Sequence, residues 1–150
     1  MKGAALLAAL ALAACGAQPR ADAPPRGPYL HVENFVLTPS GAAGESDGYL
    51  LVRNEGDSPD TLTAAASPLA QRIDVRDTRL DATGAAQTFP IAGVVSIPAQ
   101  GEVRFARGGL YLAAQGLRAP LAEGDRAPVT LTFARSGAIE VEAVVASAAP

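Results

Sequence analysis

Sulfur and imidazole are scarce in this 150-residue sequence, which contains one cysteine, one methionine and one histidine. With Cys15 as the only cysteine, no intramolecular disulfide can form. Nucleophilic catalysis by serine or cysteine needs a base that activates the nucleophile, and only His31 could serve as that base. Metal-independent hydrolysis is therefore disfavoured, and we predict that the protein is not an enzyme.

Long apolar runs are also missing, apart from one near the start of the chain. Met1, Lys2 and Gly3 precede an almost unbroken apolar stretch over residues 4–14, which is too short to span a bilayer. A short positive start followed by a short apolar region is typical of an export signal. We predict that residues 1–14 are a cleavable signal peptide.

The signal ends in Leu-Ala-Ala-Cys, which resembles the lipobox of bacterial lipoprotein precursors. This resemblance implies that Cys15 carries a diacylglyceryl group and becomes the mature N-terminus, anchored in a membrane. An ordinary secretory signal that happens to contain a cysteine is the alternative. Lipoproteins kept at the inner membrane carry an aspartate after that cysteine, whereas this chain has Gly16. The expected location is the outer membrane, facing the periplasm, with the inner membrane less favoured.

The mature chain has a linker before its folded part. Residues 15–28 contain the expected lipidation site and a proline-rich segment without large apolar groups, which could extend over about 40 Å. Residues 29–146 are enough for one domain with a core, and residues 147–150 form a tail.

Lysine is absent after Lys2, so every other basic side chain is an arginine. The arginines are interspersed with acids, as Arg72 and Arg76 are around Asp74, and form no basic stripe. The net charge is −3, and it becomes −4 when Lys2 is removed with the signal. Nucleic acid is therefore not an expected partner.

Apolar residues alternate with polar ones along most of residues 29–146, and turn signals separate the alternating segments. This pattern predicts an all-β fold, a Greek-key barrel or sandwich of short antiparallel strands. Segments 128–134 and 138–144 flank Arg-Ser-Gly and are predicted to form a hairpin. The residues expected on buried strand faces include Leu30, Val32, Val36, Tyr49 and Leu51. Two pairs of acids are expected to face outward, Asp57 with Asp60 and Glu140 with Glu142.

The order of short motifs resembles that of the periplasmic copper chaperones of the PCu(A)C family. The motifs are residues 48–57 (GYLLVRNEGD), 73–75 (IDV), 97–101 (IPAQG), 108–109 (GG), 120–125 (PLAEGD) and 128–133 (PVTLTF). The resemblance implies a cupredoxin-like β-barrel. It also implies a family ligand set of two histidines and two methionines, which suits the soft ion Cu(I).

None of these four ligands is present in this chain. By resemblance, Arg76 and Tyr111 replace the two histidines, Gln87 or Phe89 replaces the first methionine, and Ala113 replaces the second. The resemblance therefore implies a divergent member with a degenerate copper site and no copper cofactor. A weaker Cu(II) or Zn(II) site at His31, with a neighbour such as Glu33, is the alternative.

Two functions follow from these observations. In the first, the domain is a non-enzymatic binding or assembly module that contacts a periplasmic protein through Arg76, Gln87, Phe89 and Tyr111, since arginine and aromatic residues are common interface anchors. Phe89 and Tyr111 could instead simply pack the end of the barrel. In the second, the protein handles metal with a site rebuilt around His31 or shared with a partner.

Overall fold

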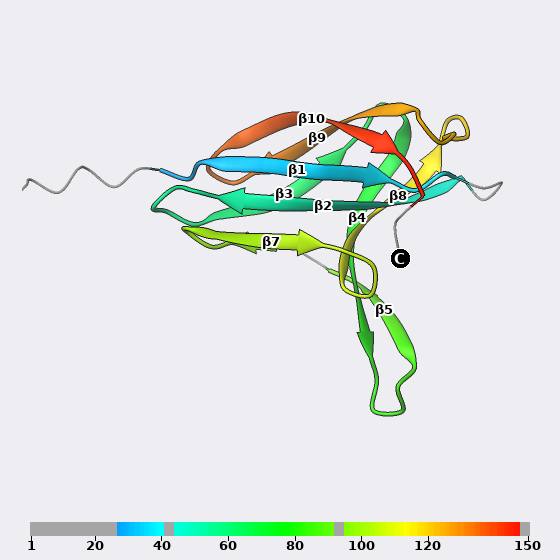
Figure 1. Ribbon diagram of the computed structural model, residues 1–150, viewed down its shortest axis with the longest axis horizontal. Coiled ribbons are helices and arrows are strands. Elements are labelled where there is room, and N and C mark those ends of the chain that lie inside the picture. The colour runs from blue at the N-terminus through cyan, green and yellow to red at the C-terminus, as the bar shows by residue number, and fades with distance from the viewer. Residues whose placement is uncertain (1–26, 41–43, 92–94, 148–150) are drawn as a thin grey trace, which may run out of the picture.

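The computed structural model describes residues 27–40, 44–91 and 95–147, and all regular secondary structure within them is β (Figure 1). The predicted all-β fold is confirmed. Nothing in these residues forms a helix of the length and hydrophobicity that a membrane crossing requires. The strands are β1 (Leu30–Leu37), β2 (Glu45–Asn54), β3 (Asp60–Ala66), β4 (Ala70–Leu80), β5 (Ala86–Pro90), β6 (Val95–Ile97), β7 (Gly101–Phe105), β8 (Leu110–Leu117), β9 (Arg126–Phe133) and β10 (Gly137–Val145).

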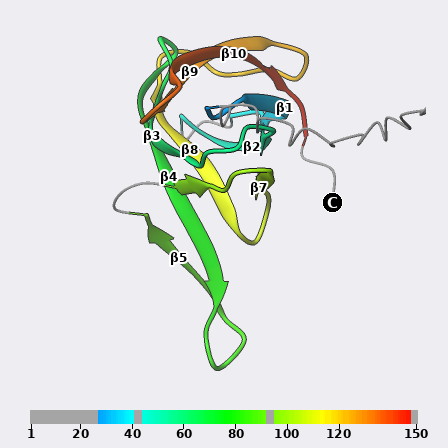
Figure 2. The same ribbon diagram turned by 90° about the vertical axis from the view of Figure 1, so that its left-hand side faces the viewer.

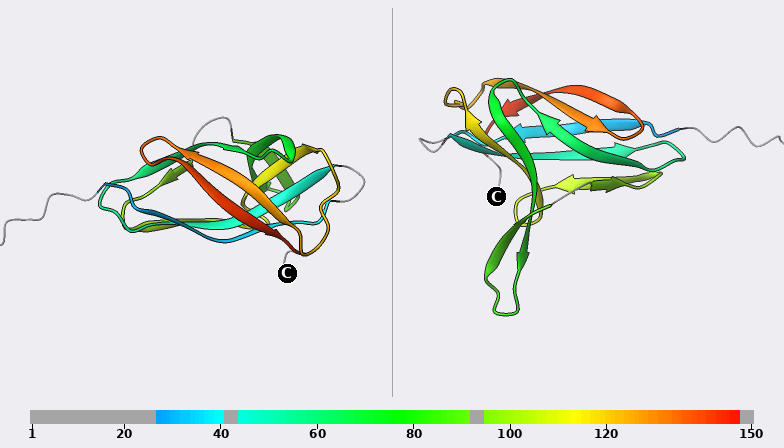
Figure 3. Two further views of the ribbon diagram at one scale, coloured as in Figure 1. Left: turned by 90° about the horizontal axis from the view of Figure 1, so that it is seen from above. Right: turned by 180° about the vertical axis from the view of Figure 1, so that it is seen from behind.

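Seven strands close into a barrel, whose wall is visible from above in Figure 3. They follow the order β4-β8-β2-β1-β10-β9-β3, and β3 returns to β4 through the pairing of Ala65 with Ile73. Most neighbouring strands are antiparallel, whereas β1 and β10 pair in parallel. Three shorter strands lie outside this circuit, with β5 on β4, β6 on β3 and β7 on β2. Closure leaves the barrel wall itself without an open edge.

One contiguous apolar core fills the barrel. Its largest fully buried side chains include Phe105, Phe133, Leu62, Ile97 and Leu112. The predicted hairpin is confirmed, because β9 and β10 pair from Phe133 opposite Gly137 onward. Glu140 and Glu142 face outward on this hairpin, as expected.

A β-bulge in β1 changes which residues face the core. The register with β2 shifts between Glu33 and Val36, and Asn34 lies in the left-handed region with a φ of 52°. The extra residue reverses the side-chain alternation, so Phe35 and Leu37 enter the core and Val36 lies on the outer face. The expectation that Val36 is buried with Leu30 and Val32 is therefore wrong.

The phase of β2 also differs from the expected one. Leu50 and Val52 belong to the core, whereas Tyr49 and Leu51 lie on the opposite, outer face of the strand. Residues 49–52 are all large and apolar, and a continuous apolar run does not indicate which alternate positions point inward. The outer face of β2 is thus lined by Tyr49 and Leu51, which matters for the surface described below.

The hairpin of β4 and β5 projects from the barrel as a two-stranded arm (Figures 1 and 2). Every residue of β5 is exposed. Leu80 is 72 % exposed and Phe89 is 52 % exposed, which makes them two of the most exposed large apolar side chains among the described residues. We call residues 78–90 the β4–β5 arm.

Asp60 is a buried charge at the start of β3, with 2 % of its surface exposed. Its carboxylate accepts hydrogen bonds from the backbone N–H groups of Thr61, Arg135 and Ser136, at 2.7, 2.9 and 2.9 Å, and from the Ser136 hydroxyl at 2.6 Å. The expectation that Asp60 faces outward like Asp57 is wrong. Asp60 ties β3 to the β9–β10 turn, which the sequence places 75 residues away.

Burial by itself raises the pKa of Asp60, but the hydrogen bonds from Ser136, Arg135 and Thr61 outweigh it, so the pKa lies below the usual aspartate value. A lowered pKa means that the ionised carboxylate favours the folded state. Its contribution to stability is present above the pKa of the unfolded chain and is lost as the pH falls through the lower, folded-state pKa.

We predict that Asp60→Ala lowers the free energy of unfolding at neutral pH by about 2–4 kcal/mol, because buried N–H groups lose their acceptor. Chemical denaturation at several pH values measures this effect. The matched control is Glu140→Ala on the exposed face of β10, for which a change of less than about 0.5 kcal/mol is expected. The difference between wild type and Asp60→Ala should shrink in acid. An equal loss in both variants, or a loss that does not change with pH, would contradict this role for Asp60.

Candidate functional site

The long pairing of β4 with β8 brings Arg76 directly opposite Tyr111. Two residues along, Asp74 lies opposite Ala113. Directly opposed residues on antiparallel strands point to the same face of the sheet. Three of the positions that the PCu(A)C resemblance assigns to copper ligands, Arg76, Tyr111 and Ala113, therefore share the outer face of two neighbouring strands.

The next strand, β2, adds an acid and a phenol to this face. Asp47 pairs with Ala113, so Ala113 lies between Asp47 on one side and Asp74 on the other. Ala113 is only 3 % exposed although it is on the outer face, because larger side chains surround it. Tyr49 follows Asp47 by two residues on β2, and the two side chains are hydrogen-bonded. We call Asp47, Tyr49, Arg76, Arg107 and Tyr111 the Asp47 cluster.

Electrostatics couple the members of the Asp47 cluster. Burial raises the pKa of Asp47, while the charge of Arg76 and the hydrogen bond with Tyr49 act in the opposite direction without cancelling the effect. Burial and the Asp47 charge together raise the pKa of Tyr49, although Arg107 hydrogen-bonds the phenol and opposes that rise. Tyr49 is therefore a neutral phenol near pH 7, held between an aspartate and an arginine.

Hydrogen bonds between β1 and β2 fix the backbone around Asp47. The backbone N–H of Asp47 donates to the Thr38 hydroxyl at 2.9 Å, and the Thr38 N–H donates to the Asp47 carbonyl at 2.9 Å. The hydroxyl of buried Ser46 donates to the Thr38 carbonyl at 2.7 Å. The neighbouring acid Asp74 forms an ion pair with Arg72 at 2.9 Å. The cluster thus rests on a rigid part of the barrel wall.

Gln87 and Phe89 do not join the Asp47 cluster. Gln87 pairs with Arg79 and Phe89 pairs with Asp77, whereas Arg76 pairs with Pro90. Because side chains alternate along a strand, Gln87 and Phe89 lie on the face of the arm opposite to that of Arg76. Of the four residues expected to form one partner surface, the structure brings together Arg76 and Tyr111 and places the other two on the reverse side of the arm.

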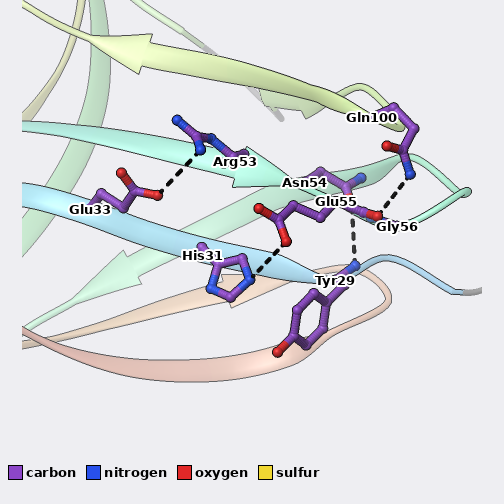
Figure 4. A network of polar contacts seen from close by, with 8 residues as sticks. All are labelled: Tyr29, His31, Glu33, Arg53, Asn54, Glu55, Gly56 and Gln100. Carbon is purple, nitrogen blue, oxygen red and sulfur yellow. Dashed lines mark hydrogen bonds and ion pairs between the residues drawn. The ribbon is translucent and has the colours of Figure 1, made fainter.

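His31 lies on β1, in the network of polar contacts shown in Figure 4, and makes two contacts there. Its Nε2 is 3.5 Å from a Glu55 carboxylate oxygen, and its ring meets Tyr29 edge-on with centroids 4.6 Å apart. Glu33, the expected partner in a metal site, instead has Arg53 at 4.0 Å. In the described residues, no three His, Cys, Asp or Glu side chains form a group that could hold a metal ion.

The same network shapes the end of the barrel. Asn54 is buried, and its side-chain oxygen accepts from the backbone N–H groups of Tyr29 and Gly56 at 3.1 and 3.0 Å. The side-chain amide of Gln100 donates to the Glu55 carbonyl at 2.8 Å. These hydrogen bonds hold residues 54–57 in a tight turn. His31 and Glu55 therefore lie at an end of the barrel where hydrogen bonds fix the backbone.

Residues 21–145 match the family described as "Putative lipoprotein LpqE-like". The chain belongs to the LpqE-like family. No curated protein matches it.

Solved structures share the fold of this LpqE-like chain. The apo PCuAC domain from PmoF1 is 21 % identical, with a TM-score of 0.65, and the alignment covers 81 % of this chain and 99 % of that chain. The copper-bound PCuAC domain from PmoF2 is also 21 % identical, with a TM-score of 0.64 and coverage of 81 % and 98 %. Apo-DR1885 from Deinococcus radiodurans is 26 % identical, with a TM-score of 0.60 and coverage of 98 % and 97 %. The predicted resemblance to the PCu(A)C family and its cupredoxin-like barrel is confirmed.

The N-terminal part of the LpqE-like chain lies outside the described residues. The signal peptide, the lipidation at Cys15 and most of the linker were predicted for residues 1–26, which are outside the described residues. The family match begins at residue 21, after Cys15.

One motif in the LpqE-like chain is easily misread. Residues 44–48 have the Gly-x-Ser-x-Gly spacing of a hydrolase nucleophile elbow. That elbow needs a sharp turn between a strand and a helix, whereas Ser46 lies within β2. Its side chain is buried, and its hydroxyl hydrogen-bonds the Thr38 carbonyl. The spacing therefore reflects a strand and not a catalytic serine.

We predict that Arg76→Gln raises the pKa of Asp47 further, because the guanidinium charge is the largest influence that lowers it. Titration of the carboxyl carbon by NMR measures this pKa. Arg126→Gln is the control, since Arg126 pairs with Glu142 on the β9–β10 hairpin. An Asp47 pKa that stays the same or falls in Arg76→Gln would show that the cluster is not coupled as described.

Proposed function

We propose that this protein is a lipid-anchored, periplasm-facing binding module without enzymatic activity, in which a polar cluster has replaced the copper site of the PCu(A)C fold. The observation that carries the proposal is the register of β4 and β8. It places Arg76 and Tyr111, which the PCu(A)C resemblance assigns to the two family histidines, side by side, with Ala113 two residues beyond Tyr111.

The chemistry of these side chains argues against Cu(I) as cargo. Cu(I) prefers thioether, thiolate and imidazole donors. The Asp47 cluster offers a carboxylate and two phenols, and its two guanidinium groups are permanent cations that repel a metal ion. Once the proposed signal is cleaved, Met1 is gone and Cys15 is acylated, so no free sulfur ligand is left in the mature chain.

A protein partner is supported by the β4–β5 arm. A two-stranded hairpin is marginally stable by itself in water. Among the described residues, no third strand pairs with the outer edge of β5, and every residue of β5 is exposed. Leu80 and Phe89 nevertheless remain in solvent on it. Exposed apolar residues on a projecting element mark interaction surfaces, and an aromatic residue beside an arginine such as Arg79 is a frequent interface anchor.

Membrane attachment and orientation are part of the same proposal. The Leu-Ala-Ala-Cys15 sequence supports acylation, and membership of the LpqE-like family, described as putative lipoproteins, supports a lipoprotein. A lipid at Cys15 followed by an extended linker would leave the barrel and its arm free to reach a partner at or near the membrane. Gly16 supports the outer membrane as the site of attachment.

We predict that the mature chain does not take Cu(I) from a competing chelator at micromolar affinity, because its cluster lacks soft donors. Competition with a chromogenic Cu(I) chelator, under reducing conditions and on residues 16–150, measures this. His31→Ala is the matched variant. Uptake by the wild type that His31→Ala abolishes would contradict the proposal and support metal handling at a site rebuilt around His31.

We also predict that the β4–β5 arm contacts a membrane-associated protein. A photo-crosslinking residue placed at position 89 of the lipidated chain should give one dominant adduct in cells, and the same residue at exposed position 140 should not. Adding Arg79→Ser to the position-89 probe should reduce the yield about tenfold or more, since Arg79 lies diagonally from Phe89 on the same face of the arm and is a candidate anchor. Equal yields at positions 89 and 140 would contradict a partner-binding arm.

A further inference from the structure

A groove of about 360 Å³ lies on the outer face of β1, β2 and β7, next to the Asp47 cluster. We call its half-buried and buried apolar residues Val36 and Leu51 the floor, and its exposed residues Arg104 and Arg107 the rim. The volume falls within the range of about 300–1,000 Å³ that is usual for small-molecule sites. Tyr49 and Arg107 belong both to this groove and to the Asp47 cluster.

Val36 reaches the floor because of the bulge in β1, and Leu51 reaches it because of the phase of β2. The bulge turns Val36 outward, where it pairs with Tyr49 on one side and Val144 on the other. Leu51 also points outward, opposite Arg104, yet it is only 7 % exposed. Val144 is 41 % exposed and extends the apolar strip onto β10. An apolar strip on an outer barrel face, where polar side chains are expected, indicates a contact with something apolar.

The rim of the groove is positively charged. Among the described residues that line it there is no carboxylate, but there are two arginines. Within the described part of the chain, Arg104 forms no ion pair. Arg107 hydrogen-bonds the Tyr49 phenol and interacts with the more distant charge of Asp47. Glu33, which lies across Leu51 from Arg104, is paired with Arg53. The guanidinium groups therefore keep most of their capacity for an external anion.

We propose that this groove binds an aliphatic carboxylate, with the acyl chain along Val36 and Leu51 and the carboxylate between Arg104 and Arg107. The apolar floor accounts for the chain, and the paired guanidinium groups account for the charged head, because arginine binds carboxylates through two parallel hydrogen bonds. Neither feature by itself selects this ligand, but their adjacency within one groove does. The site is separate from the arm proposed to bind a protein.

Three probes test the proposal on residues 16–150, which keep every described residue. Dodecanoate has the chain and the head, dodecyltrimethylammonium has the same chain with the opposite charge, and acetate has the head alone. Affinities come from calorimetry below the micelle concentration, and amide NMR shifts locate the binding. Dodecanoate should bind at least about tenfold more tightly than either other probe, with the largest shifts at residues 34–36, 51 and 104–107.

Arg104→Gln and Arg107→Gln should each weaken dodecanoate binding about tenfold, since each removes a charge-assisted hydrogen bond. Arg118→Gln, which changes an exposed arginine outside the groove, should leave the affinity unchanged. A dispersed amide spectrum checks that each variant is folded, and either groove variant suffices if the other unfolds. The proposal is overturned by equal binding of the two long-chain probes, by acetate binding as tightly as dodecanoate, by shifts elsewhere, or by groove variants that bind like Arg118→Gln.

Discussion

The antiparallel pairing between β4 and β8 determines both the closure of the barrel and the chemistry of its surface. It runs from Ala70 opposite Leu117 to Asp77 opposite Leu110. The inward-facing residues of this ladder join the core, so the register cannot slip by one residue without exposing them. The same constraint fixes the outward residues. Arg76 must lie against Tyr111, and Asp74 must lie against Ala113.

In the function proposed above, the surface built on this ladder corresponds to the copper site of the PCu(A)C family. The positions that the resemblance assigns to imidazole and thioether carry a guanidinium, a phenol and a methyl group, which do not suit Cu(I). Asp47 and Tyr49 from β2 then build a polar network over the small residue Ala113. A fold can keep its scaffold while its site changes, so function has to be argued from the site.

The sequence was sufficient for the features that depend on short-range pattern. Alternation predicted the strands, and Arg-Ser-Gly between two alternating segments predicted the β9–β10 hairpin. The order of motifs grouped Arg76, Tyr111 and Ala113 as candidate site residues, and the strand register brings these three together on one face.

Features that depend on tertiary context could not be predicted in this way. No local signal reveals that Asn34 opens a bulge, or which way the apolar run of β2 faces. The sequence around Asp60 is that of an ordinary exposed turn. Its burial becomes evident only in the folded structure, where the β9–β10 turn directs backbone N–H groups at its carboxylate. The pairing of Phe89 with Asp77 decides which face of the arm Phe89 lies on. The length of the loop between β4 and β5 does not predict that pairing.

In the proposed function, Arg76 and Tyr111 occupy the positions where this fold would hold copper. Replacing both with histidine and titrating the variant with Cu(I) in competition with a chelator tests this correspondence. Side chains on directly opposed strand residues are about 5 Å apart at Cβ, so two imidazoles there can share one ion. The account predicts that the double variant acquires Cu(I) binding that the wild type lacks. Equal binding by wild type and variant, or no binding by the variant, would contradict it.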